Sequence, residues 1–210
     1  MLGFIKKDLL MMKSNLKLLV ILWFVYGFMA FQGKMDLSFL LPFMTVMIMM
    51  STFSYDTFNK WDAYAITLPD GRKNSVRAKY LSTILLIVVT TILVAILELV
   101  IAYVRTGVID FENILLTIFG GAFATTILQS FMYPSIYKFG VEKARIGIFV
   151  VVFGAAIIGG LLFKHIDLTA LEGMVRFLED YGEIIFPIIM VLMLYISYKI
   201  SEGIYKKKEF

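Results

Sequence analysis

Six apolar stretches constrain the fold of this sequence more than any other feature, because each approaches or exceeds the length needed to cross a lipid bilayer. A helix needs about 20 residues to span a hydrocarbon core that is roughly 30 Å thick. Hydrophobic residues make up 60% of the chain, which is more than a soluble domain of this size can bury. The sequence therefore predicts an all-α, polytopic membrane protein, a single domain over residues 1–210, with six transmembrane helices at Leu16–Phe31, Leu37–Phe53, Tyr80–Val104, Ile114–Tyr137, Ile146–Phe163 and Ile184–Tyr205.

The positions of the lysines and arginines predict the orientation of these six helices. Loops on the cytoplasmic side of a membrane are enriched in basic residues. If the N-terminus is cytoplasmic, 16 of the 20 basic residues fall in cytoplasmic segments, and the exceptions are Lys34, Arg105, Lys164 and Arg176. Both termini are therefore expected on the cytoplasmic side. A cleaved signal peptide is the disfavoured alternative for the first stretch, which lacks a small-residue cleavage site.

The N-terminal segment, residues 1–15, is expected to form a cytoplasmic interface helix. Leu2, Ile5, Leu9 and Met12 are spaced to share one apolar face, and Lys6, Lys7, Asp8 and Lys13 fall mostly on the remaining surface. Such an amphipathic pattern is typical of a helix that lies in the plane of the membrane surface. A generic basic anchor and a specific mechanical role are both compatible with this pattern.

The longest cytoplasmic connection, between the second and third apolar stretches, is expected to contain a helix over residues 54–69. Phe58, Trp61, Ala65 and Leu68 form an apolar stripe, with Ser54 at the position of an N-cap. Pro69, Asp70 and Gly71 then end this helix, and Asp70 can cap the next one. The stripe fits either a helix resting among lipid headgroups or a helix that docks on a partner protein.

The segment 164–183, on the external side, is too long for a simple turn. Asp167 is placed to cap a helix, and four apolar residues share one of its faces: Leu168, Leu171, Val175 and Leu178. An external amphipathic helix is therefore expected before the last transmembrane helix. It could cover a transport pathway or pack on the outer leaflet.

Reactive chemistry is scarce in this sequence. It has no G-x-x-x-x-G-K-[ST] phosphate loop, no cysteine, and one histidine, His165, without a second potential zinc ligand nearby. We therefore expect neither an enzyme nor a metal site. The basic residues flank apolar stretches and do not form one patch, so nucleic acid is not an expected partner.

Three residues in the apolar stretches are candidates for a transport pathway or its gating. Glu98 is an ionisable group within the third stretch, which is a functional candidate by default, although it lies in the outer third where water reaches it. Gln129 and Pro134 lie in the fourth stretch, where proline is expected to kink the helix. A structural role remains open for each of the three.

The cytoplasmic connection carries a motif that resembles a known family. It reads Tyr55-Asp56, Lys60-Trp61-Asp62, Tyr64, Thr67-Leu68-Pro69, Arg72 and Lys79-Tyr80. This pattern is similar to that of ABC transporter type 2 permeases, in particular a small bacterial six-helix branch that includes exporters of phenol-soluble modulins and other amphipathic peptides. The resemblance covers essentially the whole chain. Asp70-Gly71 departs from the pattern, which has a small apolar residue and a serine there.

The resemblance implies a bacterial cell-membrane permease that is driven by a separate ATP-binding subunit. The helix at 54–69 would be a coupling helix, and ATP and Mg²⁺ would be bound by the partner. Two permeases, either a homodimer or a pair of sister chains, would assemble with two ATPases. Phe58, Trp61 and Tyr64 would anchor the coupling helix, and Asp56, Lys60 and Asp62 would set its register. Tyr55 completes the set of coupling residues.

Two other functional classes compete with the exporter. A substrate-binding membrane component of a vitamin importer would also have about six helices, but it would need polar ligand groups near the outer face. Glu98 and scattered Thr, Ser and Gln residues are the main polar groups that the apolar stretches offer. A membrane protein without transport activity is the third possibility.

Overall fold

The computed structural model describes residues 1–33, 40–107, 109–163 and 172–208, and these form eight α-helices and no strand. An all-α fold is therefore confirmed. The helices are α1 (Leu2–Ser14), α2 (Leu16–Phe31), α3 (Leu40–Phe58), α4 (Trp61–Ala65), α5 (Gly71–Thr106), α6 (Phe111–Phe139), α7 (Val141–Phe163) and α8 (Glu172–Lys206).

Three of these helices contain apolar segments that are long enough to cross a membrane: Gly71–Arg105 in α5, Ile114–Phe139 in α6 and Ile185–Lys206 in α8. Large apolar side chains on α5 such as Ile92, Ile96 and Val100 are exposed, as expected for a helix surface that faces lipid. The protein is therefore embedded in a membrane. α2 is apolar but shorter, at 16 residues, and the count of six transmembrane helices stays a prediction.

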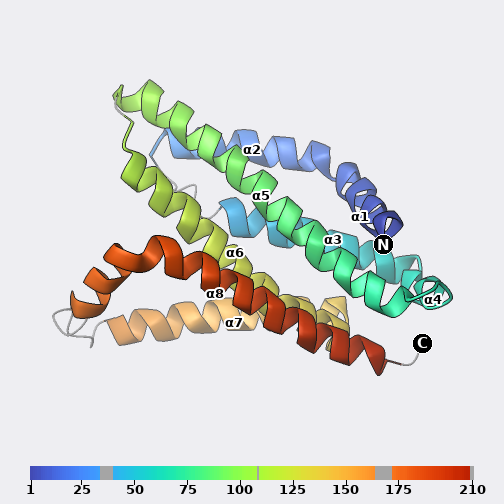
Figure 1. Cartoon of the computed structure of the whole chain (residues 1–210). Helices are drawn as coiled ribbons and strands as arrows, with labels where there is room; N and C mark the ends of the chain where they lie inside the picture. Colours follow the sequence, from blue (N-terminus) through green and yellow to red (C-terminus); the bar gives the residue numbers. More distant parts are fainter. Residues whose placement is uncertain (34–39, 108, 164–171, 209–210) are drawn as a thin grey trace.

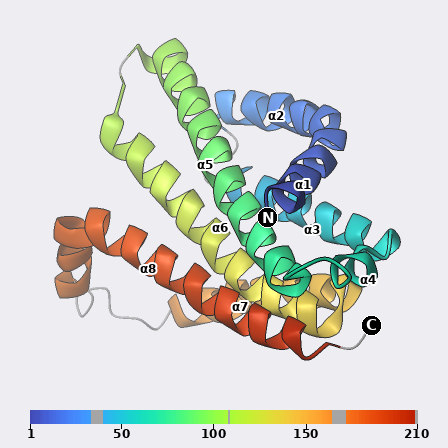
Figure 2. The same ribbon diagram turned by 45° about the vertical axis from the view of Figure 1, so that its right-hand side comes forward.

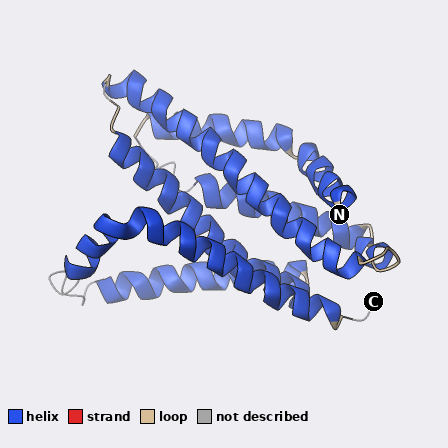
Figure 3. Cartoon of the chain, viewed as in Figure 1, coloured by secondary structure: helices blue, strands red, loops and turns tan. Residues whose placement is uncertain are grey.

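The N-terminus, α4 and the C-terminus lie together at one end of the molecule (Figure 1). The connection between α5 and α6 lies at the opposite end, and the rotated view in Figure 2 shows the same division. Figure 3, in which helices are blue and loops tan, shows that helix accounts for nearly all of the described chain. Two termini at one end are what an even number of membrane crossings requires.

The helix expected over residues 54–69 has different bounds in the structure. α3 continues through Ser54 to Phe58, Lys60 adopts a left-handed conformation with φ 50°, and α4 is a separate helix of five residues. Ser54 is therefore not an N-cap; its hydroxyl donates to the Met50 carbonyl within α3 at 2.9 Å. The Ser54 hydroxyl is thus used inside α3 and does not cap a new helix at this position.

The start of α5 depends on a close approach of two backbone segments. Asp70 occupies the N-cap position, as expected, but it has φ 53° and its side chain makes no capping hydrogen bond. A Cβ atom added to Gly71 would overlap the carbonyl oxygen of Ala65. Glycine at position 71 therefore lets α5 begin directly against the end of α4.

The described part of the predicted external helix belongs to α8. Residues 164–171, which include His165, Asp167 and Leu168, lie outside the described residues. From Glu172 onward the chain is one helix that continues to Lys206 with Pro187 in its interior. A separate external helix within residues 164–183 is therefore not confirmed, because its described part, from Glu172, is continuous with the last helix. Proline permits a bend without ending the helix, and α8 is visibly curved toward its start (Figure 2).

An aromatic core joins four helices at the end that carries α4. Tyr133 of α6 packs edge-on against Phe53 of α3 and Tyr80 of α5, with ring centroids 5.2 and 4.9 Å apart. Tyr137 of α6 packs against Tyr205 of α8 at 5.2 Å. All five rings are buried. Each such pair contributes about 0.5–1.5 kcal/mol beyond the burial of its area, so the helix ends that surround the candidate site are held firmly.

Candidate functional site

The short helix α4 is held on one side by α1. The ring of Trp61 packs edge-on against Phe4, with centroids 5.7 Å apart, and the Lys7 amine lies 4.5 Å from the centre of the same indole. Ala65 at the end of α4 is fully buried against Phe4 and Ala78 of α5. The inward face of α4 is therefore fixed to the N-terminal helix.

The other side of α4 is tied to the end of α8. The Tyr205 hydroxyl donates to Asp62 Oδ1 at 2.8 Å, and the Lys208 amine lies 3.7 Å from Asp62 Oδ2. Arg72, near the start of α5, donates to the carbonyl of Lys206 at 2.6 Å. A helix of one and a half turns is thus attached through side chains to both α1 and the C-terminal end of α8.

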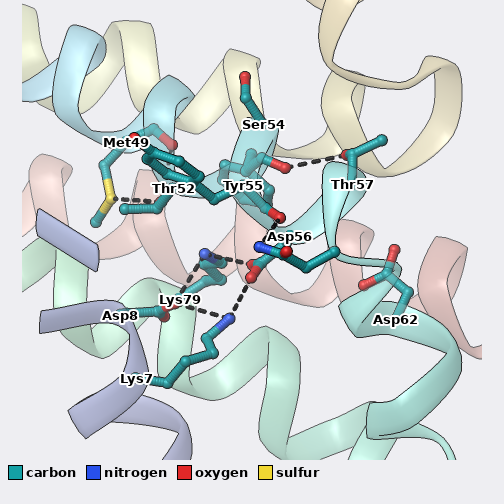
Figure 4. Close-up of polar contacts among 12 residues, drawn as sticks. Lys7, Asp8, Met49, Thr52, Ser54, Tyr55, Asp56, Thr57, Asp62 and Lys79 are labelled. Carbon is teal, nitrogen blue, oxygen red and sulfur yellow. Dashed lines mark hydrogen bonds and ion pairs between the residues drawn. The ribbon is translucent and has the colours of Figure 1, made fainter. Parts of the chain in front are cut away.

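Four charged side chains meet beside α4 and link α1, α3 and α5 (Figure 4). We call Lys7, Asp8, Asp56 and Lys79 the four-charge cluster. The Lys79 amine contacts Asp8 at 2.9 Å and Asp56 at 2.7 Å. The Lys7 amine contacts Asp56 at 2.5 Å and Asp8 at 3.1 Å. Each cation therefore touches both anions, and the cluster carries no net charge.

Burial makes the four-charge cluster sensitive to the loss of any member. The side chains of Asp8 and Lys79 are 2% and 3% exposed, and those of Asp56 and Lys7 are 7% and 15% exposed. Buried charges pay a desolvation cost that only close and complete pairing offsets. Removal of one member leaves a buried charge without compensation, so the cluster fixes how α1 sits on α3 and α5.

Asp8 does not lie on the exposed surface of α1, where the sequence pattern predicted it. The buried residues of α1 are Phe4, Asp8 and Met12, whereas Leu2 and Leu9 are exposed. Asp8 is therefore not on the remaining surface, because Lys79 of α5 supplies the buried partner that it needs. The spacing of Phe4, Asp8 and Met12 at i, i+4 and i+8 was the available signal, since it places all three on one face.

The seven predicted coupling residues divide into two groups. Asp56, Trp61 and Asp62 turn inward and make the contacts described above. The others are exposed: Phe58 by 85%, Tyr64 by 57%, Tyr55 by 40%, and Lys60 also. The structure thus separates residues that attach this segment to the rest of the protein from residues that remain accessible to a partner.

The three candidate pathway residues are not brought together. Gln129 is fully buried and accepts a hydrogen bond from Tyr133 at 3.2 Å, and Tyr133 also bonds Thr83 of α5. Glu98 is half-buried on α5, about 22 Å along the helix from Thr83 at 1.5 Å per residue. Pro134 lies within α6 and is half-buried. No group of three or more potential metal ligands occurs in the part of the chain that the structure describes.

Comparison with known proteins identifies the family. A family model described as "ABC-2 family transporter protein" matches residues 3–206, which is nearly the whole chain. No curated protein and no solved structure matched the chain significantly. Membrane-length helices without a phosphate loop are what a membrane component of an ATP-driven transporter requires. The chain therefore belongs to the ABC-2 transporter family.

Proposed function

We propose that this protein is the permease subunit of an ATP-driven exporter and that a separate ATP-binding subunit docks on residues 55–64. The observation that carries the proposal is the exposure of Phe58 and Tyr64, at 85% and 57%, on a segment that is otherwise tightly attached. Large aromatic residues that stay exposed on a rigid surface are typical anchors of protein interfaces.

The attachments of this segment suit it to transmit force. A displacement of α4 reaches α1 through the contact of Trp61 with Phe4, and it reaches α8 through the bond between Asp62 and Tyr205. The four-charge cluster passes the same displacement to α3 and α5. ATP and Mg²⁺ bind the partner subunit, and closure of two such partners moves the attached helices as rigid bodies.

The distribution of basic residues supports an orientation with α4 and both termini in the cytoplasm. The segments richest in lysine and arginine are the N-terminal segment, the connection through α4 into α5, and the C-terminus, which lie at one end of the molecule (Figure 1). That end faces the cytoplasm under the positive-inside rule. In this proposal the chain crosses a bacterial cell membrane six times, and two permeases assemble with two ATPases.

The proposed substrate is an amphipathic or hydrophobic peptide. The resemblance of the Tyr55–Tyr80 region to exporters of such peptides supports this assignment, as does the scarcity of charge in the apolar stretches. Glu98, Gln129 and Pro134 remain candidates for the pathway or its gating. A neutral, apolar pathway can accommodate apolar side chains without a desolvation penalty. It supplies few hydrogen-bond partners for a small polar vitamin, whose desolvation would therefore be costly.

The docking surface is tested with the double variant Phe58→Ala/Tyr64→Ala. The tagged chain is purified from its native membranes, and the co-purifying protein is identified by mass spectrometry through its G-x-x-x-x-G-K-[ST] loop. We expect the double variant to bind that protein at least about 30-fold more weakly, as hot-spot residues do, and to lose stimulation of its ATPase activity by substrate.

Phe111→Ala is the matched control, because Phe111 is 65% exposed and begins α6 at the end of the molecule opposite to α4 (Figure 1). This variant is expected to keep both binding and ATPase stimulation. If the double variant retains the ATP-binding protein as fully as Phe111→Ala does, residues 55–64 are not the docking surface.

A further inference from the structure

An open groove lies between α1 and the end of α3, next to the four-charge cluster. Its volume is about 560 Å³, and the side chains that line it include Lys6, Lys7, Leu10, Met11, Tyr55 and Asn59. None of the lining residues is acidic. The groove therefore combines cations and neutral hydrogen-bond donors with two apolar side chains.

The electrostatics of the groove favour a singly charged anion. Lys7 lines the groove but is paired with Asp56 and Asp8, so its charge is already balanced. Lys6 is exposed and makes no ion pair among the described residues. The Asn59 amide uses one N–H on the Tyr55 carbonyl at 2.9 Å and has a second to offer. The single uncompensated charge, on Lys6, and the neutral donors beside it are complementary to a phosphodiester, which carries one negative charge and accepts hydrogen bonds.

The apolar side of the groove indicates that this anion carries hydrocarbon. Leu10 and Met11 line the groove, and Leu2, Leu9 and Leu10 on α1 are exposed. Exposed leucines between exposed lysines are typical of a helix seated in the boundary between headgroups and acyl chains. A soluble phosphate compound would satisfy the lysine and the donors but would leave these leucines in water.

We propose that the groove between α1 and α3 binds the phosphodiester headgroup of an anionic phospholipid of the cytoplasmic leaflet. Lys6 supplies the charge, Tyr55 and Asn59 supply hydrogen bonds, and Leu10 and Met11 contact the glycerol and the first methylenes of the acyl chains. Lys7 lines the groove, belongs to the four-charge cluster and lies over the Trp61 ring, so the lipid binds next to the contacts that hold α4.

In the test, the full chain is purified in a lipid-free neutral detergent and titrated with phosphatidylglycerol and, separately, with phosphatidylcholine. Native mass spectrometry counts the lipid molecules that remain bound. We expect Lys6→Glu to weaken phosphatidylglycerol binding by about tenfold or more, since a single basic residue near anionic lipid contributes roughly fivefold and charge reversal costs more. Lys6→Arg is expected to restore binding. Lys13→Glu, an equal charge change at an exposed site of α1 outside the groove, is expected to bind normally.

Four results would overturn the proposal. Equal losses for Lys6→Glu and Lys13→Glu would mean a diffuse surface attraction, and equal binding of phosphatidylcholine would mean that charge does not select the ligand. Displacement of phosphatidylglycerol by glycerol 3-phosphate at similar concentration would identify a soluble phosphate site. If Lys6→Glu leaves lipid binding unchanged in this titration but loses the ATP-binding protein in the co-purification from native membranes, the groove is a protein contact. The titration uses no ATPase, so its outcome is independent of the docking proposal.

Discussion

Lys79 is a buried cation at the junction of α1, α3 and α5. Its amine contacts Asp8 and Asp56, and it also lies 4.7 Å from the centre of the Phe53 ring. Without this amine, two buried carboxylates would share the single remaining cation, Lys7. Like charges in a poorly solvated site repel strongly, so a single residue here determines whether α1 stays in place.

We therefore predict that Lys79→Met destabilises the protein. Loss of one partner of a buried pair costs about 3 kcal/mol or more, which corresponds to a fall in Tm of about 10 °C for a chain of this length. Thermal unfolding in detergent measures the change. The double variant Lys79→Met/Asp8→Asn is expected to recover part of the loss, because it removes one of the two carboxylates. A Tm for Lys79→Met equal to that of the exposed control Lys13→Met would contradict this account of the cluster.

The junction of α4 with α5 determines how these two elements move relative to each other. Gly71 begins α5 against the Ala65 carbonyl at the end of α4, and Lys60 and Asp70, the residues that precede the two helices, both have left-handed backbones. So short a connection allows few alternative positions of α4 relative to α5. The two helices are therefore expected to move as one rigid body.

The prediction at this scale concerns Gly71→Ala. The added methyl group cannot fit against the Ala65 carbonyl, so α4 must shift away from α5 at a cost of about 1–3 kcal/mol. Limited proteolysis between Ala65 and Asp70 is expected to become faster. Gly203→Ala in α8 is the control, since a Cβ there meets nothing within 4 Å. Equal cleavage rates in the two variants would show that the close approach does not hold α4.

Sequence patterns predicted helices in apolar segments better than the connection that carries the candidate site. The residues of α2 match the expected Leu16–Phe31, because an apolar stretch in a membrane has helix as its main option. The bounds of α4 were missed because Ser54 and Thr57 bond back to carbonyls of α3 and let that helix continue. Such local bonds compete with capping, and composition does not decide between them.

The contacts of the candidate site could not be predicted from the sequence, for a different reason. Asp8 and Lys79 are 71 positions apart, and Tyr205 and Asp62 are 143 apart. Periodicity within one helix identifies which residues share a face but not which helix lies opposite. The motif led to the prediction of a docking segment at 55–64, and the structure adds that Phe58 and Tyr64 are exposed whereas Trp61 and Asp62 turn inward.

An ATP-binding subunit can dock on α4 only if that end of the molecule faces the cytoplasm. α4, the N-terminus and the C-terminus share that end, and the connection between α5 and α6 lies at the other (Figure 1). The chain has no cysteine, so single cysteines report on exposure without any background. Glu112 near the start of α6 and Lys143 near the start of α7 are both exposed.

We predict that a membrane-impermeant maleimide labels Glu112→Cys in intact cells and labels Lys143→Cys only after the cells are permeabilised. Under the positive-inside rule, the charge distribution predicts that the α5–α6 connection is outside and that the α6–α7 connection is inside. The reverse labelling pattern would mean that the protein has the opposite orientation in the membrane, with α4 outside the cell, where a cytoplasmic ATP-binding subunit could not reach it. Labelling of both sites in intact cells would contradict the six-crossing topology.

Photo-cross-linking in native membranes can show whether a separate ATP-binding subunit docks on the exposed aromatic residues beside α4. A benzoylphenylalanine placed at position 58 is expected to form a covalent adduct with a protein that contains a phosphate-loop motif, because Phe58 is exposed on that surface. The same probe at position 111 is expected to form no such adduct. An adduct absent at position 58, or equally abundant at position 111, would contradict the claim.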